Sequence, residues 1–367
     1  MAKTILVVDD DSDTLTLIGL TLQRRGFEVI KAQSGQQAIN LLAHDRPDLV
    51  ILDVMMPQMD GYEVCREIKA DPRTADLPVI MLTAKAQTQS QLEGFRVGAI
   101  DYITKPVHPQ DLVTRIQTVL ERAQSAHQAG GARVIAVSGA RGGVGASTLA
   151  VNLAAALAAQ HRTVLVDLEL SGTAAIQLGL SPLRGLADLM SYDTDPIDRH
   201  HVETAITPHA SGLHLLAAAD SPIDPGRALV ILNHLLAMYE VCIIDLGWGM
   251  GQIVRAIAPR ANRVLLATDA DRASVTQASR LQHLLIEAGT PAEAISLIWI
   301  NRHGTPAETA LASLQAGLGR APAAAIGPAP EAMFAALDIG QPLVLAQPTD
   351  AVAVQLTELS ASLLPAA

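Results

Sequence analysis

The sequence predicts an α/β fold with two doubly wound parallel-sheet domains. Short apolar runs alternate with helical patterns along the chain, the arrangement that builds parallel sheets from strand-helix-strand units. Polar residues follow several of these runs, and a glycine-rich turn follows one of them. The periodicity is lost between residues 123 and 132. We therefore expect a domain at 1–122, a linker at 123–132 and a second domain at 133–367.

The composition indicates a soluble globular protein. The 367 residues are 49% hydrophobic and 17% charged. Cys65 and Cys242 lie in apolar or helical patterns, which favours core positions in a reducing compartment over a disulfide. No apolar run approaches the roughly 18 residues of a membrane span, so we expect a cytoplasmic protein without an integral membrane segment. Aromatic residues make up only 2% and every lysine precedes residue 122, so we expect no specific nucleic-acid binding.

Four apolar runs of the first domain end in polar residues. Asp9 and Asp10 follow the first run, and Asp53, Thr83 and Lys105 follow later ones. Because the carboxyl ends of parallel strands meet at one sheet edge, we expect these side chains to converge on one site. Asp9, Asp10 and Asp53 suit Mg²⁺, and Asp53 is also a candidate nucleophile for phosphoryl transfer. Lys105 could neutralise phosphoryl oxygens and Thr83 could hydrogen-bond to them.

These residues lie in four motifs. The motifs are Val8-Asp9-Asp10, Leu52-Asp53-Val54-Met55-Met56-Pro57-Gln58-Met59-Asp60-Gly61, Leu82-Thr83-Ala84 and Asp101-Tyr102-Ile103-Thr104-Lys105-Pro106. In order and spacing they resemble the receiver domain of bacterial two-component response regulators, which has a flavodoxin-like fold. The resemblance implies that a sensor histidine kinase phosphorylates Asp53, that Thr83 and Tyr102 form a conformational switch, and that the Met55 carbonyl is a further metal ligand. It also implies a cis Lys105-Pro106 bond.

A receiver-like fold that serves only for dimerisation is the alternative interpretation of the first domain. Such degenerate receivers usually lose one of the acids, the threonine or the lysine, and this sequence retains all of them. The complete set of residues favours a domain that can be phosphorylated.

A glycine-rich turn opens the second domain, between an apolar run at 134–137 and an alanine- and leucine-rich helix. Backbone N–H groups of such a loop surround phosphate at a helix N-terminus, and the Ser147 hydroxyl could bind Mg²⁺. The position before Ser147, where phosphate-binding loops carry lysine, is Ala146. The candidate nucleotide-binding residues of the loop are Arg141, Gly142, Gly143, Val144, Gly145, Ala146, Ser147 and Thr148.

The missing lysine weakens the prediction of catalysis more than that of binding. A lost charge-assisted phosphate contact costs about 1.5–3 kcal/mol, or roughly ten- to a hundredfold in affinity. No lysine follows Lys105, so none in the second domain can replace it, although Arg141 could supply charge. We expect nucleotide binding without rapid turnover. The alternative is a strand-to-helix turn that binds no nucleotide.

Further strands of the second domain also end in polar residues. Asp167 could orient an attacking water, Asp245 could hold Mg²⁺ through water, and Asn301 could hydrogen-bond an adenine edge. An acid at a strand end is about as often a helix cap, but the three occur together in the expected order. Helices are expected around residues 183–190, 225–239, 271–288, 307–316 and 350–364.

The loop and these strand ends resemble the ParA/MinD class of P-loop ATPases, whose domain is P-loop NTPase-like. The resemblance implies ATP or ADP with Mg²⁺ as cofactors. It places Arg141 at the position of a signature lysine, Asp167 and Asp245 at two switch aspartates, and Asn301 and Arg302 in the nucleotide-base segment.

A receiver-type domain joined to such an altered ATPase is similar to the CpaE/TadZ group of pilus-assembly proteins. Ala140 through Thr148, with Asn152-Leu153-Ala154, carries this resemblance. It implies a homodimer that acts as a polar localisation factor for the Tad (Flp) pilus secretion machinery. The implied partners are pilus and secretion assembly proteins, through which the protein would reach the cell pole or the membrane.

The leading hypothesis is that phosphorylation of Asp53 shifts a dimer equilibrium and so controls a nucleotide-binding, weakly or non-hydrolysing second domain. One alternative is an active ATP-hydrolysing positioning or partitioning protein in which Arg141 replaces the lysine. Another is a structural scaffold that binds neither nucleotide nor a phosphoryl group.

Overall fold

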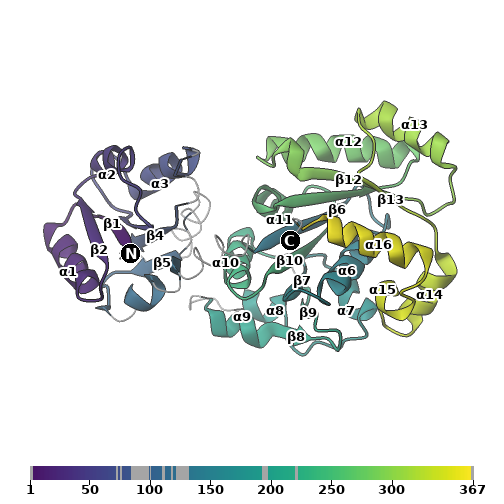
Figure 1. Ribbon diagram of the computed structural model, residues 1–367, viewed down its shortest axis with the longest axis horizontal. Coiled ribbons are helices and arrows are strands. Elements are labelled where there is room, and N and C mark those ends of the chain that lie inside the picture. The colour runs from purple at the N-terminus through teal and green to yellow at the C-terminus, as the bar shows by residue number, and fades with distance from the viewer. Residues whose placement is uncertain are drawn as a thin grey trace. The chain divides into compact units, whose positions relative to one another are not determined.

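The computed structural model divides the chain into two units, Met1–Gly131 and Ala132–Ala367. It describes residues 3–71, 73–74, 77–83, 99, 101–109, 112–116, 119–120, 132–191, 197–219 and 222–364. The expected linker lies outside these residues except for Ala132, and so does the side chain of Tyr102. Figure 1 shows a sheet flanked by helices in each unit.

The first unit is a parallel five-stranded sheet in the order β2-β1-β3-β4-β5. This strand order confirms the flavodoxin-like fold. The strands are β1 Thr4–Val8, β2 Glu28–Ala32, β3 Leu49–Asp53, β4 Val79–Thr83 and β5 Asp101–Thr104. The helices with described bounds are α1 Ser12–Gln23, α2 Gly35–Leu42 and α3 Gly61–Ala70.

Sequence features of the first unit explain where its helices begin. The Asp11 carboxylate accepts a hydrogen bond from the Asp13 N–H and so caps α1. Asp60 and Glu63 form a reciprocal capping box at the start of α3. Every residue of β3 is buried, as expected of a strand covered on both faces. The helix caps and the buried strand together fix where β1 and β3 end, and the polar residues of the candidate site lie at these ends.

The second unit is an eight-stranded sheet in the order β13-β12-β11-β6-β10-β7-β9-β8. Its strands are β6 Arg133–Gly139, β7 Thr163–Asp167, β8 Ile206–Pro208, β9 His214–Leu216, β10 Val241–Trp248, β11 Arg263–Thr268, β12 Ile295–Ile300 and β13 Ala324–Ile326. The sheet is parallel, as expected, except at one edge, where β8 pairs with β9 in the antiparallel direction. A short hairpin there needs no helical crossover.

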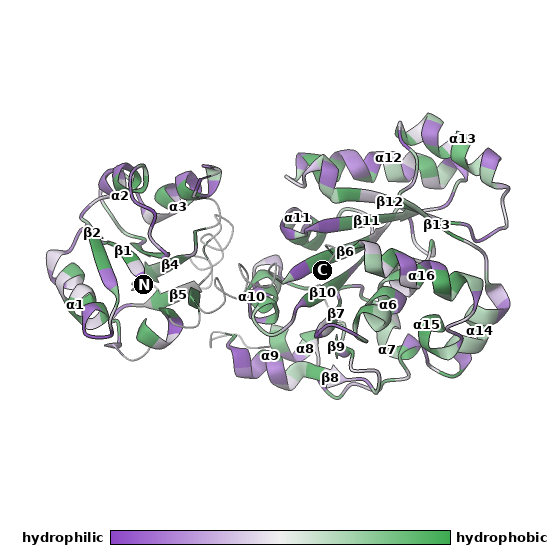
Figure 2. Ribbon diagram, viewed as in Figure 1, coloured by the Kyte–Doolittle hydropathy of each residue, from purple (hydrophilic) through white to green (hydrophobic). Residues whose placement is uncertain are grey.

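Two hydrophobic layers cover the faces of the second sheet. One contains buried residues of α10, α11, α12 and α13, and the other contains those of α6, α15 and α16. Figure 2 shows hydrophobic colour along the central strands and hydrophilic residues on the outer turns of α12. The helices are α6 Ala146–Leu157, α7 Thr173–Gln177, α8 Leu186–Met190, α9 Arg199–Ala205, α10 Pro225–Leu236, α11 Gln252–Ile257, α12 Arg272–Glu287, α13 Ala307–Leu318, α14 Pro330–Asp338, α15 Leu343–Ala346 and α16 Ala351–Ser362, with 3-10 turns Ala258–Arg260 and Ala292–Ala294.

A buried amide fixes α6, the helix that follows the glycine-rich loop. The Asn152 side chain donates to the Thr148 carbonyl at 2.8 Å and accepts from the Val344 N–H at 3.1 Å. Asn152 is 1% exposed, so these bonds satisfy a polar group inside the core and join α6 to α15.

Cys65 in α3 and Cys242 in β10 are both buried, as their sequence patterns predict. Over the described ranges, no helix combines the length and apolar character needed to cross a membrane.

Candidate functional site

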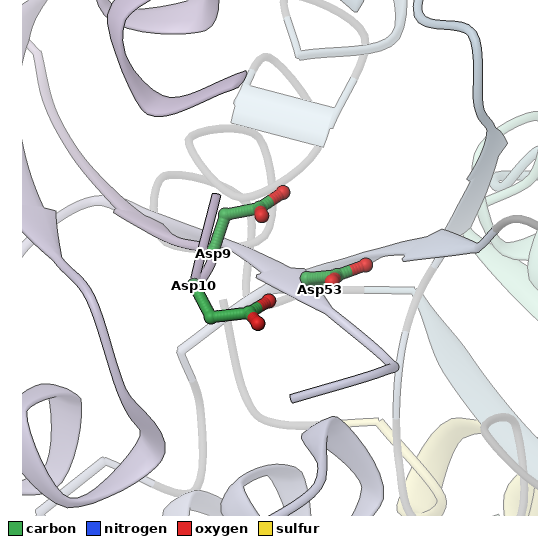
Figure 3. Close-up of side chains that lie close together, drawn as sticks. All are labelled: Asp9, Asp10 and Asp53. Atoms are coloured by element: carbon green, nitrogen blue, oxygen red, sulfur yellow. The ribbon is translucent and has the colours of Figure 1, made fainter. Parts of the chain in front are cut away.

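The first candidate site lies at the carboxyl edge of the smaller sheet. β1 and β3 are neighbours, so Asp9 and Asp10, which follow β1, come close to Asp53 at the end of β3. One carboxylate oxygen from each of the three lies within 4.8 Å of the others, and Figure 3 shows the three side chains gathered together. Asp9 and Asp53 are buried, whereas Asp10 is exposed. Three oxygen donors around a point open to solvent fit a Mg²⁺ ion that keeps part of its water shell.

Lys105 joins two of these acids. Its ammonium Nζ lies 2.8 Å from Asp9 Oδ2 and 3.0 Å from Asp53 Oδ1. The Lys105-Pro106 bond is cis, as the resemblance predicts. Burial raises the pKa of Asp53, the hydrogen bond from Lys105 lowers it, and the Asp9 charge raises it further, with a net increase. Burial lowers the pKa of Lys105, but its bonds to Asp9 and Asp53 outweigh this and raise it.

The other predicted residues of this site occupy neighbouring positions. Thr83 is buried at the end of β4, and its carbonyl accepts the Lys105 N–H at 2.8 Å. Met55 is exposed just after β3, and Tyr102 lies in β5 opposite Met81. The switch roles of Thr83 and Tyr102 and the ligand role of the Met55 carbonyl stay predictions.

Gly61 is a structural requirement of this site that sequence reasoning did not single out. A Cβ atom at this position would lie 2.2 Å from the Asp53 carbonyl oxygen and 2.9 Å from the Val54 Cα. Only glycine therefore allows the start of α3 to pack against the backbone that carries Asp53. The signal available in the sequence was the glycine itself, eight residues after the candidate nucleophile.

The second candidate site is the glycine-rich loop between β6 and α6. Gly143 and Gly145 have φ angles of 73° and 102°, in the left-handed region that favours glycine. A Cβ at Gly139 would lie 3.0 Å from the Arg141 carbonyl oxygen. The loop thus folds tightly over the N-terminus of α6, where free backbone N–H groups can receive an anion.

A cavity of about 540 Å³ lies over this loop and falls in the size range of small-molecule sites. The whole loop 141–148 lines it, together with Glu169 after β7 and residues that follow β12. Trp248 at the end of β10 also lines it and is 63% exposed. A Cβ at Gly142 would lie 3.5 Å from the Trp248 indole, so the ring borders the loop closely.

Two buried acids lie on adjacent strands of the larger sheet. Asp167 ends β7 as expected, whereas Asp245 lies inside β10, which continues beyond the expected end to Trp248. Asp167 in β7 is the register partner of Asp245 in β10, and both are 0% exposed. Burial and the charge of Asp245 raise the pKa of Asp167 to about 7, against hydrogen bonds from the Glu169 and Ala174 N–H groups. Burial also raises the pKa of Asp245, while the Ser147 hydroxyl lowers it.

The two oxygens of Asp245 differ in their surroundings. Oδ1 accepts the Gly247 N–H at 2.9 Å, whereas buried Oδ2 has no hydrogen-bond partner among the described residues. An unsatisfied carboxylate oxygen beside a phosphate-type loop fits a hydrated Mg²⁺ ion carried by a nucleotide.

Three predicted nucleotide ligands have protein partners. Arg141 donates from Nε to Ser274 Oγ at 2.6 Å. The Asn301 amide donates to the Thr305 carbonyl at 2.9 Å and accepts the Thr305 N–H at 2.8 Å. Arg302 donates from its guanidinium to the Gly143 carbonyl. The structure thus places all three at the cavity, while contact of Asn301 with an adenine stays a prediction.

The described geometry agrees with comparisons to known proteins. Residues 5–117 match the model of the response regulator receiver domain, and residues 132–288 match that of an AAA domain. The first part is 43% identical over 122 residues to the phosphate regulon transcriptional regulatory protein PhoB of Pseudomonas aeruginosa, covering 33% of this chain and 53% of that protein. The chain spans about half the length of the curated relatives it matches.

Solved structures resemble the second part. A ParA family ATPase from Chlorobium tepidum superposes with a TM-score of 0.58 at 23% identity, over 62% of this chain and 98% of that one. The cell division ATPase MinD of Pyrococcus furiosus gives a TM-score of 0.50 at 21% identity, over 62% and 97%. At these identities the likeness establishes the fold. The chain therefore carries a response regulator receiver domain followed by an AAA domain with the ParA/MinD-like fold.

Proposed function

We propose that this protein is a response regulator in which phosphorylation of Asp53 controls a nucleotide-binding second domain that hydrolyses ATP slowly or not at all. The observation that carries the proposal is the placement of Lys105 between Asp9 and Asp53, with Asp10 alongside. This set combines a nucleophile, metal ligands and a fixed cation.

In the proposed reaction a carboxylate oxygen of Asp53 attacks phosphorus, a P–O bond forms, and the bond to the donor breaks. The donor is a phosphohistidine of a sensor histidine kinase, whose imidazole leaves with the bonding electrons. Lys105 stands 3.0 Å from Asp53 Oδ1 and can pair with the transferred phosphoryl oxygens. Mg²⁺ held by Asp9, Asp10 and Asp53 would supply further charge neutralisation.

Intact mass spectrometry after incubation with a small phosphodonor and Mg²⁺ tests this function. We expect the mass to rise by one phosphoryl group in the wild type and to stay constant in Asp53→Asn. Unchanged wild-type mass over a range of donors and metal concentrations would contradict phosphorylation.

For the second domain we propose binding of ATP or ADP with Mg²⁺. The support is the 540 Å³ cavity, the left-handed glycines of the loop, and the unpartnered Oδ2 of Asp245. Ser147 and Asp245 would hold the hydrated metal, and Asp167 would orient water. Nucleotide released by denaturing the freshly purified protein, analysed by chromatography, identifies the resident ligand.

We further propose a role in localising or assembling a Tad (Flp) type pilus secretion system, as a homodimer whose equilibrium responds to phosphorylation. The support is the similarity of the loop 140–148 to that of the CpaE/TadZ group. In a deletion strain, we expect the wild-type gene to restore pili and Asp53→Asn to restore fewer. Normal piliation of the deletion strain would remove this proposal.

A further inference from the structure

The glycine-rich loop of the second domain lacks the lysine that would neutralise the phosphates of a bound nucleotide. Ala146 occupies the position of the phosphate-binding lysine, and no lysine follows Lys105 in the chain. The charged side chains that line the cavity are Arg141, Glu169 and Arg302. A positive charge for the phosphates therefore has to come from one of the two arginines, within the described part of this domain.

Arg141 is held by the N-terminus of α12. Its Nε donates to Ser274 Oγ at 2.6 Å, and its terminal nitrogen lies 3.4 Å from Asp271 Oδ2. Asp271 is also the N-cap of α12 and accepts the Ala273 and Ser274 N–H groups. The Arg141 charge is therefore partly neutralised by an acid that is itself fixed by the helix.

Arg302 is held differently. It follows β12, is exposed, and donates from its guanidinium to the carbonyl of Gly143 in the middle of the loop. The end of β12 abuts the loop, since a Cβ at Gly145 would lie 3.4 Å from the Ile300 side chain. Across the described ranges no carboxylate pairs with Arg302. Its charge is thus uncompensated and lies against the phosphate loop.

We propose that Arg302 binds the β- and γ-phosphates of the nucleotide and supplies the positive charge that is missing at Ala146. This inference rests on the proposed nucleotide-binding function. A guanidinium offers several N–H donors in a planar fork and can exchange the Gly143 carbonyl for phosphate oxygens. The positive charge that pairs with the phosphates would then come from a loop more than a hundred and fifty residues after the glycine-rich turn.

Calorimetric titration of the full chain with Mg-ATP, Mg-ADP and AMP tests the proposal. Arg302→Ala should weaken Mg-ATP binding by about ten- to a hundredfold, because a charge-assisted contact is lost. AMP, which lacks the β- and γ-phosphates, should bind with unchanged affinity. Arg280→Ala removes an exposed arginine on α12 outside the cavity and should leave all three affinities unchanged. Thermal unfolding verifies that each variant is folded.

A second experiment introduces a lysine at position 146. Ala146→Lys should recover Mg-ATP affinity in the Arg302→Ala protein, and the effect of Arg302→Ala should be smaller in the Ala146→Lys background. Equal Mg-ATP affinities of wild type and Arg302→Ala would overturn the role of Arg302 and leave nucleotide binding intact. An equal loss for AMP and ATP would also overturn it, since Arg302 would then only support the loop. Absence of binding in both the wild type and Ala146→Lys would overturn the proposed nucleotide function as well.

Discussion

Asp167 and Asp245 face each other across neighbouring strands of the larger sheet, and both side chains are completely buried. Two carboxylates at paired positions of adjacent strands oppose each other's ionisation, and burial also disfavours the charged form of each. The pKa of Asp167 rises to about 7 as a result. Without a metal ion, the folded protein therefore carries an acid that is half protonated near neutral pH.

This relationship predicts how stability depends on pH. A folded-state pKa above the ordinary value of 3.8 means that the associated stability is present at low pH and is lost as pH rises through 7. In EDTA, Asp167→Asn should therefore gain about 2.7 kcal/mol of stability relative to wild type between pH 5 and pH 8, because the pH passes through about two units below the folded-state pKa. Urea unfolding at both pH values measures this difference. The exposed Asp338→Asn variant should show no such trend, and a pH-independent difference for Asp167→Asn would contradict the shifted pKa.

Removing Lys105 should slow phosphorylation of Asp53. The ammonium lies 3.0 Å from Asp53 Oδ1, where it can neutralise charge that develops on the phosphoryl oxygens. We expect Lys105→Ala to lower the rate on the order of a hundredfold with a small-molecule donor. Lys3→Ala breaks another lysine-aspartate pair, with Asp48, before the start of β1 and serves as the matched control. Equal rates for the two variants would exclude a role for Lys105 in transfer.

Gly61→Ala should destabilise the receiver domain. The added methyl group would meet the Asp53 carbonyl at 2.2 Å, so the start of α3 must shift. We expect a loss of about 1–3 kcal/mol in the urea transition of this domain, as for other overpacked sites. Gly251→Ala adds a Cβ with no atom within 4 Å and should cost much less. Similar losses in both variants would show that the close approach is not the cause.

The buried amide of α6 makes a separate stability prediction. Asn152→Ala leaves the Val344 N–H without its acceptor in a buried position. An unsatisfied buried donor costs about 1–3 kcal/mol, which should appear in the unfolding transition of the second domain. Asn40→Ala removes an exposed amide from α2 and should change stability by less than about 0.5 kcal/mol. A neutral Asn152→Ala would mean that the core rearranges to satisfy Val344.

ATP turnover should be slow. The loop has no lysine to stabilise charge on the transferred phosphoryl group, and Arg141 is bonded to Ser274. We expect steady-state phosphate release no faster than that of an Asp245→Ala control. Release well above this control would favour the alternative of an active ATP-hydrolysing positioning protein.

The strands with long apolar runs were predicted correctly. Long buried runs such as those of β3 and β10 are unambiguous, and the order of polar strand ends predicted both sheets' central strands. Strands β2, β8, β9 and β13 were not predicted. Strands β8, β9 and β13 have three residues each, too few to establish a period, and β2 mixes charged and apolar residues. Their pairing depends on neighbours far along the chain, which local patterns do not specify.

The partners of the arginines illustrate the same limit at the candidate site. Nothing near Arg141 in the sequence indicates that Ser274 receives its guanidinium, because the contact forms only when α12 lies beside the loop. The contact between Arg302 and Gly143 likewise depends on the end of β12 reaching the loop.

Motifs indicated Arg141, Asn301 and Arg302, which line the cavity, but not Glu169 or Trp248, which line it too. Asp167 and Asp245 are not among the described residues that line it. The directions of the side chains required the structure.

The indole beside the glycine-rich loop gives the protein an optical reporter of its own. Of the two tryptophans in the chain, Trp299 is 3% exposed within β12, and Trp248 is 63% exposed against Gly142. A soluble quencher such as acrylamide would therefore reach Trp248 far more readily than Trp299. The quenchable part of the intrinsic fluorescence then follows the state of the loop, without any label or substitution.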